Sequence, residues 1–492
     1  MPTKIIFILS LCCAIALQWG CRKEEVFDMN SSLEFSLDTL RFDTVFTELG
    51  SSTRFFKVYN NSDLSIKISN IQLANGSNSL FRLNVDGISG NTAQDVEING
   101  NDSIYIFIEV TIDPDAPLSV SPYIVDDLVR FETNGNTQEV RLEAWGQNAN
   151  YIPSRFSRGQ FSFLSCDFGE VVWDDPKPYV IYGVLFVDSC TLTLPPGQKV
   201  YVHGGIARNG DLVFNDGLMI FLENGKLNVK GTSTDPVTIQ GDRLEEEFRD
   251  ISGQWSGIRF SVGSTGNLIE HAIIKNSVVG TFVDSAASLT INNSQIFNTS
   301  GPGIFGSHAS IDVTNSLIHT NGTFSAQFSY GGNYSLTYCT LANFLNNNEA
   351  LQLTNFRCAD ALCQSGIPNG LTCRVKNSII YGSGSDEISM VDIFNGDEPD
   401  MFNYNFENCI VRTDELTDME NFPNFYDNCD PCENVQEFNA ILFESIDERD
   451  FHLDSLSIAE SMAAPIPGIP IDLEFNFRDV STPDLGCYEY QE

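Results

Sequence analysis

A repeated motif between residues 271 and 411 constrains the fold more than any other feature of this sequence. Each copy begins with Asn or a replacement, continues with a small residue, and ends on an apolar one. The copies are His271-Ala-Ile-Ile274, Asn293-Ser-Gln-Ile296, Asn315-Ser-Leu-Ile318, Tyr338-Cys-Thr-Leu341, Asn377-Ser-Ile-Ile380 and Asn408-Cys-Ile-Val411. The first three steps span 22, 22 and 23 residues, and the last two span 39 and 31, which places insertions around 356–370 and 382–399. Such regular self-similarity indicates a solenoid.

The phase of the apolar residues changes at the start of each copy. Leu289 and Ile291 precede one Asn at odd positions, whereas Ser294 and Ile296 follow it at even positions. Because inward side chains on one strand share parity, the switch predicts a bend at the Asn with inward-facing strands on both sides. Asn tolerates the left-handed backbone of such a bend, and stacked Asn side chains can hydrogen-bond from coil to coil. The predicted ladder contains Asn293, Asn315, Asn377 and Asn408, with His271 and Tyr338 as departures.

Short strands between Gly-rich turns extend this pattern back to about residue 165. The stretches Gly225-Lys-Leu-Asn-Val-Lys-Gly231 and Gly253-Gln-Trp-Ser-Gly-Ile-Arg-Phe260 resemble right-handed parallel β-helix surface proteins of Gram-negative bacteria. Pro483-Asp-Leu-Gly-Cys-Tyr-Glu489 resembles the closing segment of the same broad family. A leucine-rich horseshoe is the competing solenoid, but the repeats are rich in strand and poor in helix patterns. The expectation is a right-handed parallel β-helix over residues 160–490, a fold that hosts many functions.

Residues 33–150 have a different organisation, with short alternating strands at regular spacing. Ser103-Ile-Tyr-Ile-Phe-Ile-Glu-Val110 is one such strand, and Asp86-Gly87 and Asn99-Gly100 are typical turns. This pattern predicts a β-sandwich, so the whole chain is expected to be all-β. The stretch Ser51–Ser62 resembles immunoglobulin-like modules of the Hydin and SPD-2 type. The resemblance implies a spacer or binding domain without chemistry of its own.

The N-terminus has the pattern of an export signal. An apolar run, Ile5–Leu17, follows Lys4 and is too short to span a bilayer, which is typical of a secretory signal over residues 1–20. Gly20-Cys21 resembles the end of a bacterial lipobox. The resemblance implies that Cys21 carries lipid and starts a tether over residues 21–32. The alternative is ordinary secretion with cleavage nearby.

The charged residues after Cys21 bear on where the chain resides. Lys23-Glu24-Glu25 resembles the surface-export signal of some Gram-negative lipoproteins, which implies an outer-membrane lipoprotein at the cell surface. The alternatives are a plain solvated tether, a periplasm-facing anchor, or secretion. The net charge of −39 repels nucleic acid and anionic lipid surfaces, and it disfavours a cationic groove for acidic polysaccharides.

Cysteines outside the signal and the anchor can be oxidised in an exported protein. Cys339 and Cys409 share a column with Ser378 between them, so their Cα atoms should lie about 9.6 Å apart, too far for a disulfide. They are interpreted as buried fillers, as is Cys373, and Cys487 has no obvious mate. Cys429-Asp-Pro-Cys432 favours a structural disulfide over a redox centre. The disulfide candidates are Cys166, Cys190, Cys358, Cys363, Cys429 and Cys432.

No catalytic set, metal site or cofactor site stands out. A polysaccharide lyase of this fold needs a base beside a cation, but the basic residues of the counted coils occur singly. A glycoside hydrolase needs two carboxylates in one groove, and Asp284 and Asp312 lie on neighbouring repeats without a paired-Asp signature. The single basic residues are Lys275, Arg374, Lys376 and Arg412, and the histidines that do not cluster include His271, His308 and His319.

Two functional hypotheses follow. The first is a non-catalytic cell-envelope lipoprotein that binds a glycan or a protein partner, or acts as a surface scaffold. The second is a divergent β-helix polysaccharide lyase or glycoside hydrolase. A groove that holds two carboxylates, or a Lys or Arg with carboxylates, would favour the enzyme. A flat face with rows of aromatic or Asn side chains would favour binding.

Overall fold

The computed structural model divides into two compact units, Met1–Asn148 and Ala149–Glu492, and each is described by itself. Cys21 and the predicted signal lie outside the described residues. Within the described part of the chain, no helix is long and apolar enough to cross a membrane. The structure describes residues 27–46, 51, 53–112, 123–154, 160–166, 169–344, 348–360, 363, 365–418, 422–437 and 440–491.

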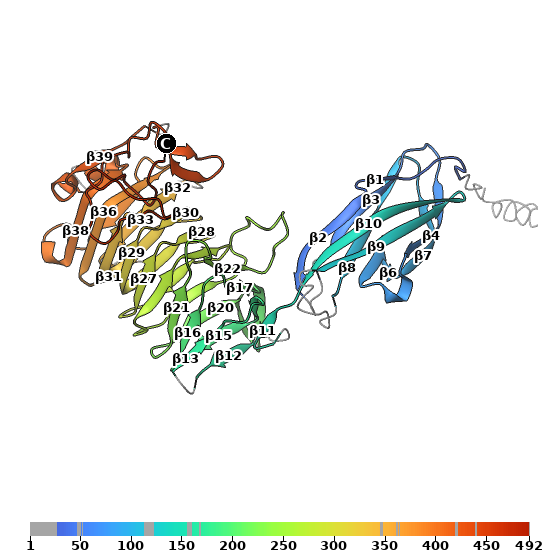
Figure 1. Ribbon diagram of the computed structural model, residues 1–492, viewed down its shortest axis with the longest axis horizontal. Helices are drawn as coiled ribbons and strands as arrows, with labels where there is room; N and C mark the ends of the chain where they lie inside the picture. The colour runs from blue at the N-terminus through green and yellow to red at the C-terminus, as the bar shows by residue number, and fades with distance from the viewer. Residues whose placement is uncertain are drawn as a thin grey trace, which may run out of the picture. The chain divides into compact units, whose positions relative to one another are not determined.

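The first unit consists of two five-stranded sheets (Figure 1). Phe56, Ile106 and Phe131 are buried members of one core, while their neighbours along each strand face outward, as the alternating sequence predicts. One sheet contains β1 (Glu34–Phe35), β3 (Arg54–Asn60), β8 (Asp102–Val110), β5 (Phe81–Val85) and β6 (Ile88–Gly90) in spatial order. The other contains β2 (Thr39–Phe46), β10 (Asn136–Gln147), β9 (Tyr123–Thr133), β4 (Ile66–Leu73) and β7 (Thr92–Ile98).

The second unit is a right-handed parallel β-helix, and together with the sandwich it confirms the predicted all-β fold. Its strands form three stacks, named here A, B and C in chain order. Stack A contains β11 (Asn150–Ile152), β14 (Tyr179–Ile181), β17 (Lys199–Val202), β22 (Val237–Gly241), β25 (Ala272–Lys275), β28 (Gln295–Thr299), β30 (Leu317–Asn321), β32 (Thr340–Asn343), the ends of β36 (Leu371–Gly382) and β38 (Phe402–Val411), and β39 (Cys432–Asn434).

Stacks B and C complete each coil. Stack B contains β12 (Phe161–Leu164), β15 (Val184–Val187), β20 (Leu218–Phe221), β23 (Gly257–Phe260), β26 (Thr281–Val283), the first halves of β29 (Ile304–Thr314) and β31 (Ala326–Thr337), β33 (Leu351–Thr354) and β37 (Ile388–Val391). Stack C contains β13 (Glu170–Val172), β16 (Thr191–Leu194), β21 (Lys226–Lys230), β24 (Asn267–Glu270), β27 (Ser288–Asn292), and the remaining halves of β29 and β31 with the first halves of β36 and β38.

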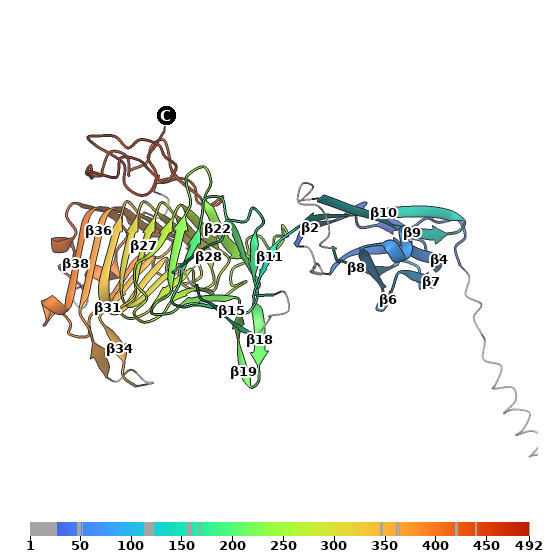
Figure 2. The ribbon, with the colours of Figure 1, turned by 60° about the horizontal axis from the view of Figure 1, so that its bottom comes forward.

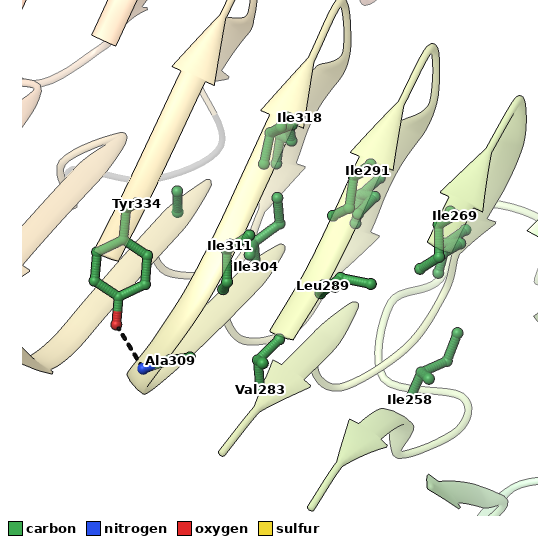
Figure 3. Close-up of a cluster of buried hydrophobic side chains, with 14 of the residues drawn as sticks. Ile258, Ile269, Val283, Leu289, Ile291, Ile304, Ala309, Ile311, Ile318 and Tyr334 are labelled. Carbon is green, nitrogen blue, oxygen red and sulfur yellow. Dashed lines mark hydrogen bonds between the residues drawn. The ribbon is translucent and has the colours of Figure 1, made fainter. Parts of the chain in front are cut away.

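The interior of the β-helix is filled by the inward residues of all three stacks. Leu289 stacks on Ile311 of the next coil, and Ile291 is the next inward residue on the strand of Leu289 (Figure 3). The Tyr334 ring fills the space beside them, and its hydroxyl accepts a hydrogen bond from the Ala309 backbone N–H at 3.4 Å. A close-packed interior of this kind leaves function to the outer faces of the stacks.

The bend from stack C to stack A lies at the repeated motif. The backbone is left-handed at all six of its first positions, with φ from 47° at His271 to 52° at Tyr338 and Asn315. Inward residues on both sides of the bend are buried, among them Ile291 and Ser294. The change of phase in the sequence therefore corresponds to a corner of the coil.

The β-helix begins earlier than the sequence pattern placed it. The expected start was residue 160, whereas β11 already pairs in register with β14, Asn150 opposite Tyr179 and Ile152 opposite Ile181. A three-residue strand is too short to show an alternating pattern, which explains the difference.

The C-terminal segment does not extend the coils, although the sequence placed it within the β-helix. The 25-stranded sheet ends at β39, and β40 (Phe443–Ser445) pairs only with β41 (Asp450–Leu453). Residues 440–491, named here the C-terminal cap, lie along the outside of stack A (Figure 2). The outward residues of stack A that pack against the cap are mostly apolar, among them Leu317, Ile379 and Ile410. Their exposure to water would be unfavourable, so a covering segment stabilises this face.

Candidate functional site

The outer faces of stacks A, B and C differ in chemistry. On stack A, Leu317, Ile379 and Tyr381 are buried under the C-terminal cap. On stack C, the central outward column is mainly polar, and Lys376 forms an ion pair with Glu407 at 2.7 Å. That column contains Thr193, Asn228, Leu268, Thr290, Asp312, Ser335, Arg374 and Asn405. Stack B differs from both, because its outward column is largely aromatic and apolar.

The outward column of stack B follows the register of its strands. Each of the first eight strands, β12 to β33, contributes one side chain that points away from the interior, and β37 continues the column with Ser389. These eight side chains are named here the aromatic row: Phe163, Phe186, Ile220, Arg259, Phe282, Phe305, Gln327 and Gln352. None of its members belongs to the buried hydrophobic clusters of the described residues, and Phe163 is 72 % exposed. Arg259 is also exposed and the other members are half-buried, so the row reaches the surface across eight coils.

Neighbouring members of the aromatic row contact one another. The rings of Phe163 and Phe186 are stacked, with centroids 5.0 Å apart, and those of Phe282 and Phe305 are 4.6 Å apart. The Arg259 guanidinium lies 4.7 Å from the Phe282 ring centroid. These contacts hold the rings in fixed orientations, and such pre-orientation lowers the entropic cost of binding a ligand.

Polar groups accompany the rings along the row. Arg259 donates to the Asp284 carboxylate, with both Nε and Nη2 2.8 Å from Oδ2. Farther along, the Gln327 amide donates to Gln352 Oε1 at 2.7 Å. A row of ring faces with guanidinium and amide groups in it and a carboxylate beside it can both stack on a ligand and hydrogen-bond to it.

Two hairpins project from the coils near the first and last members of the row (Figure 2). The first consists of β18 (Gly205–Asn209) and β19 (Leu212–Asp216), and its Phe214 ring lies 5.6 Å from the Phe161 ring. The second consists of β34 (Phe356–Cys358) and β35 (Gly366–Pro368). The hairpins therefore add apolar surface at the start of the row and mark its end.

The predicted asparagine ladder is short. Asn315 donates to Asn293 Oδ1 at 2.6 Å, and the Asn293 amide lies 3.4 Å from His271 Nε2. Beyond this point the bend residues bind the cap instead. Tyr338 Oη and Asn377 Nδ2 both donate to the Ala464 carbonyl, at 3.0 and 2.7 Å. Asn408 has the same left-handed backbone, with φ of 50°. The first three bend residues therefore link neighbouring coils, whereas Tyr338 and Asn377 bind the C-terminal cap.

Three disulfides join the six cysteines that the sequence proposed as partners. Cys166–Cys190 connects the chain before β13 to the chain before β16, and its Cα atoms are 5.3 Å apart. Cys358–Cys363 closes the loop of the second hairpin, and Cys429–Cys432 lies at the last coil, where Cys432 is opposite Cys409. The four free cysteines of the described residues are Cys339, Cys373, Cys409 and Cys487, all of them buried.

The basic residues considered for catalysis lie on two different faces. Lys275 and Arg412 are outward on stack A, where they lie 5.8 Å from the Phe297 ring and 5.6 Å from the Tyr381 ring. Arg374 and Lys376 are outward on stack C. Lyase chemistry needs a base and a charge-neutralising group at one substrate, and this distribution does not bring them together.

The acidic residues and histidines are also dispersed. Asp284 follows stack B in an ion pair with Arg259, whereas Asp312 is outward on stack C. His319 is buried under the cap beside Phe451, and His271 lies 5.3 Å from the Phe475 ring. Among the described residues, no group of three or more His, Cys, Asp or Glu side chains could hold a metal ion.

Glu387 is the carboxyl group whose pKa burial raises most clearly, to about 8. Perturbed groups of this kind are common at active sites, which makes it the strongest remaining catalytic candidate. It is fully buried, however, and its two oxygens accept hydrogen bonds from the backbone N–H groups of Ala350 and Gly384, at 2.9 and 2.7 Å. A carboxyl enclosed in this way fastens one coil to the next and has no access to a polymer substrate.

Sequence reasoning missed the aromatic row. Phe282 and Phe305 lie in the apolar runs Thr281-Phe-Val283 and Ile304-Phe-Gly306, so the sequence does not distinguish inward from outward positions there. The available signal was the alignment of the middle residue of each stack B strand. That alignment requires the lengths of the turns between stacks, which vary from coil to coil.

The chain matches no protein-family model and no curated protein sequence. Among solved structures, it is similar to the pectate lyase Pel9A at 13 % identity, covering 70 % of this chain and 88 % of that one, with a TM-score of 0.34. It is similar to the GH87 α-1,3-glucanase of Streptomyces thermodiastaticus at 9 % identity, covering 72 % and 79 %, with a TM-score of 0.23. A PapD-like domain of human CEP192 matches at 11 % identity, covering 27 % and 96 %, with a TM-score of 0.18. These likenesses carry no argument about what this chain binds or catalyses, and the strand register itself defines the β-helix.

Proposed function

We propose that this chain is a non-catalytic, lipid-anchored envelope protein that binds an uncharged glycan along the aromatic row. The observation that carries the proposal is the row itself, which crosses eight strands of stack B outside the buried clusters. The faces of pyranose rings present C–H groups that pack on aromatic rings, and their hydroxyls pair with guanidinium, carboxylate and amide groups. An elongated row suits a polymer better than it suits a small ligand.

The net charge of the chain favours an uncharged glycan over an anionic one. With a net charge of −39, the chain repels polyanions at long range, and the Arg259 cation is already paired with Asp284. Uronate-rich or sulfated polymers would lack a counter-charge on the row. A neutral polysaccharide meets no such repulsion.

The proposed lack of catalysis rests on geometry. Arg259 and Asp284 lie together beside the row, but a hydrogen bond and an ion-pair contact, both of 2.8 Å, already join them to each other. The carboxylates Asp284 and Asp312 belong to different faces, and so do the pairs of basic residues described above. Acid–base cleavage of a glycosidic bond needs two such groups on one substrate. A divergent lyase or hydrolase remains the alternative, and it would reveal itself by cleavage products.

The test is a binding and depolymerisation screen with the soluble mature chain, in which Cys21 is replaced by Ser. A glycan array identifies the polymer, and product analysis measures cleavage. Phe282→Ala/Phe305→Ala should weaken binding about tenfold, because two stacking contacts of roughly 0.5–1.5 kcal/mol each are lost. The matched control is Thr290→Ala/Ser335→Ala on stack C, which should bind as the parent does. Product formation by the parent, or unchanged binding by the Phe variant, would contradict the proposal.

The lipid anchor is tested separately, in cells. Cys21→Ala should move the chain from the membrane fraction to the soluble fraction, because a lipidated Cys is the attachment that we propose. Protease treatment of intact cells should degrade the parent chain if it resides at the outer surface. Unchanged fractionation of Cys21→Ala would remove the anchor from the proposal and leave the aromatic row untouched.

A further inference from the structure

The two outer faces of the β-sandwich differ as strongly as the faces of the β-helix. The sheet β2-β10-β9-β4-β7 presents ion pairs, including Arg130–Glu139 at 2.8 Å and Lys67–Asp95 at 3.0 Å. The sheet β1-β3-β8-β5-β6 instead exposes aromatic side chains at its centre. Phe55 is 51 % exposed and Tyr105 is 36 % exposed. The ion-paired sheet also exposes Trp145 and Ile124, but the β1-β3-β8-β5-β6 sheet differs in that its exposed rings contact one another.

The aromatic side chains form one contiguous cluster, named here the platform: Phe55, Tyr105 and Phe107. Phe55 on β3 is directly opposite Phe107 on β8, and Tyr105 is two residues before Phe107 on the same face. The rings of Tyr105 and Phe107 are nearly parallel, with an interplanar angle of 16° and centroids 5.9 Å apart. Phe55 lies 5.3 Å from Tyr105 and 5.9 Å from Phe107.

A hollow of about 670 Å³ adjoins the platform, and its lining combines apolar surface with six polar residues. Phe107 belongs to both features, so the platform and the hollow are continuous. Asn84 and Ser89 lie on the same side and share a hydrogen bond of 3.1 Å, and Arg82 is opposite Glu109 in the register of β5 and β8. The polar lining residues are Thr53, Arg82, Asn84, Ser89, Asn91 and Glu109.

We propose that the platform and its hollow form a second glycan-binding site, which takes an uncharged hexopyranose chain. One or two sugar rings pack on the platform, while hydroxyls of the next unit pair with the amide, hydroxyl, guanidinium and carboxylate groups of the hollow. Arg82 faces Glu109 and the Lys57 ammonium lies 4.8 Å from the Tyr105 ring centroid, while the net charge of −39 repels a polyanion at long range. This site lies on a different compact unit from the aromatic row and does not depend on it.

Other occupants fit the observations less well. A peptide strand that extends the sheet would bind at an edge strand, whereas the platform lies on the central strands β3 and β8. An anionic lipid surface is repelled by the net charge. A second copy of the chain carries the same charge, so association through this face would bring two strongly acidic molecules together.

The test uses the full mature chain with Cys21→Ser and affinity electrophoresis in gels that contain one uncharged hexose polysaccharide each: a β-glucan, a mannan or starch. Phe55→Ala/Tyr105→Ala is the platform variant. Trp145→Ala/Ile124→Ala is the matched control, because these two exposed apolar residues are opposite each other on the other sheet, 46 % and 60 % exposed. Phe282→Ala/Phe305→Ala removes the centre of the aromatic row. Thermal unfolding of each variant checks that the sandwich still folds.

We expect at least one polysaccharide to retard the parent and the control equally, and to retard the platform variant about tenfold more weakly. In the background of Phe282→Ala/Phe305→Ala, the remaining retardation should disappear when the platform is also removed. Equal retardation of the platform variant and the parent overturns the second site, whatever the aromatic row does. Equal loss in the control overturns it too. If only Phe282→Ala/Phe305→Ala reduces the retardation, the second site is overturned and the proposed function stands.

Discussion

The outer faces of stacks A and B both carry apolar side chains that point away from the interior of the β-helix, but only those of stack A are covered by another part of the chain. On stack A the chain covers them with its own C-terminal cap, so that Ile379, Tyr381 and Ile410 are fully buried. On stack B the aromatic row stays outside the buried clusters, with Phe163 72 % exposed. The polar face of stack C shows that this fold can have a surface of Ser, Thr and Asn, so the row on stack B is a specific feature.

The comparison separates stability from binding. Residues under the cap should matter for the free energy of unfolding, because their burial contributes to it. Residues of the aromatic row should matter for ligand binding and little for folding, because their removal opens no internal cavity. The predictions below test this separation, from the largest expected effect on stability to the smallest.

Arg478 joins the cap to stack A and should give the largest effect. Its guanidinium donates to Asn315 Oδ1 at 2.7 Å, pairs with the Glu489 carboxylate at 3.3 Å, and lies 3.9 Å from the Tyr338 ring. Arg478→Met leaves a buried carboxylate without its charge partner, which should lower the free energy of unfolding by roughly 3–5 kcal/mol. Chemical denaturation measures the effect. Arg374→Met, on the polar face of stack C, is the control and should change stability by less than about 0.5 kcal/mol. Equal effects of the two substitutions would break the comparison.

Phe451 should show the cost of removing one ring from the cap. It is 3 % exposed and lies 5.3 Å from Phe443 and 4.8 Å from His319. Phe451→Ala should destabilise the chain by about 3 kcal/mol, because a buried ring leaves a cavity when it is removed. The same measurement on Phe305→Ala in the aromatic row should give less than about 1 kcal/mol. Similar values for the two variants would mean that the row is part of the folded core.

Acid should weaken the cap through His319. Complete burial lowers the pKa of His319 to about 3, with a smaller contribution from the Arg449 charge. The unfolded chain therefore binds more protons than the folded chain between about pH 6.5 and pH 3, and stability is lost as the pH falls through this window. Between pH 7 and pH 5 the loss should be about 2 kcal/mol. His319→Phe, which retains a ring against Phe297, should lose less stability over the same interval. Identical pH profiles of the variant and the parent would refute this role.

The smallest effect on stability is expected in the aromatic row, where the effect on binding is largest. Phe282→Ala/Phe305→Ala should keep the unfolding midpoint of the parent to within a few degrees, while glycan binding falls about tenfold. Denaturation and affinity electrophoresis on one preparation measure both quantities. A large drop in the midpoint together with unchanged binding would reverse the assignment of the two faces.

The corner of the coil could be predicted from the sequence, because its physical requirement falls on single residues. A left-handed bend at each turn of the solenoid favours Asn, and a fixed step between the Asn residues reveals the period. Tyr338 and His271 occupy the same bend, with φ of 52° and 47°. Their residue types do not indicate a bend, but the fixed spacing from the neighbouring Asn residues does. The cysteine pairs were also accessible, since partners close in sequence or in adjacent coils satisfy the geometry of a disulfide.

The cap and the aromatic row could not be predicted in the same way. Arg478 contacts Asn315 across 163 residues of sequence, and nothing local to either residue indicates the other. Outward apolar residues such as Leu317 and Phe282 have the same appearance in the sequence, although one is buried beneath the cap and the other belongs to the row. Whether such a residue is covered depends on a segment far away in the chain. The candidate site therefore required the three-dimensional register.

Oxidative footprinting by mass spectrometry, with and without a bound polysaccharide, tests the central claim most directly. In the free chain, Phe163, Phe282 and Phe305 should react, whereas Tyr381 and Phe451 under the cap should be protected. Addition of the polysaccharide identified in the binding screen should protect the aromatic row and leave the outward residues of stack C unchanged. Protection of stack C in place of the row, or labelling of the row that the polysaccharide does not alter, would contradict the account.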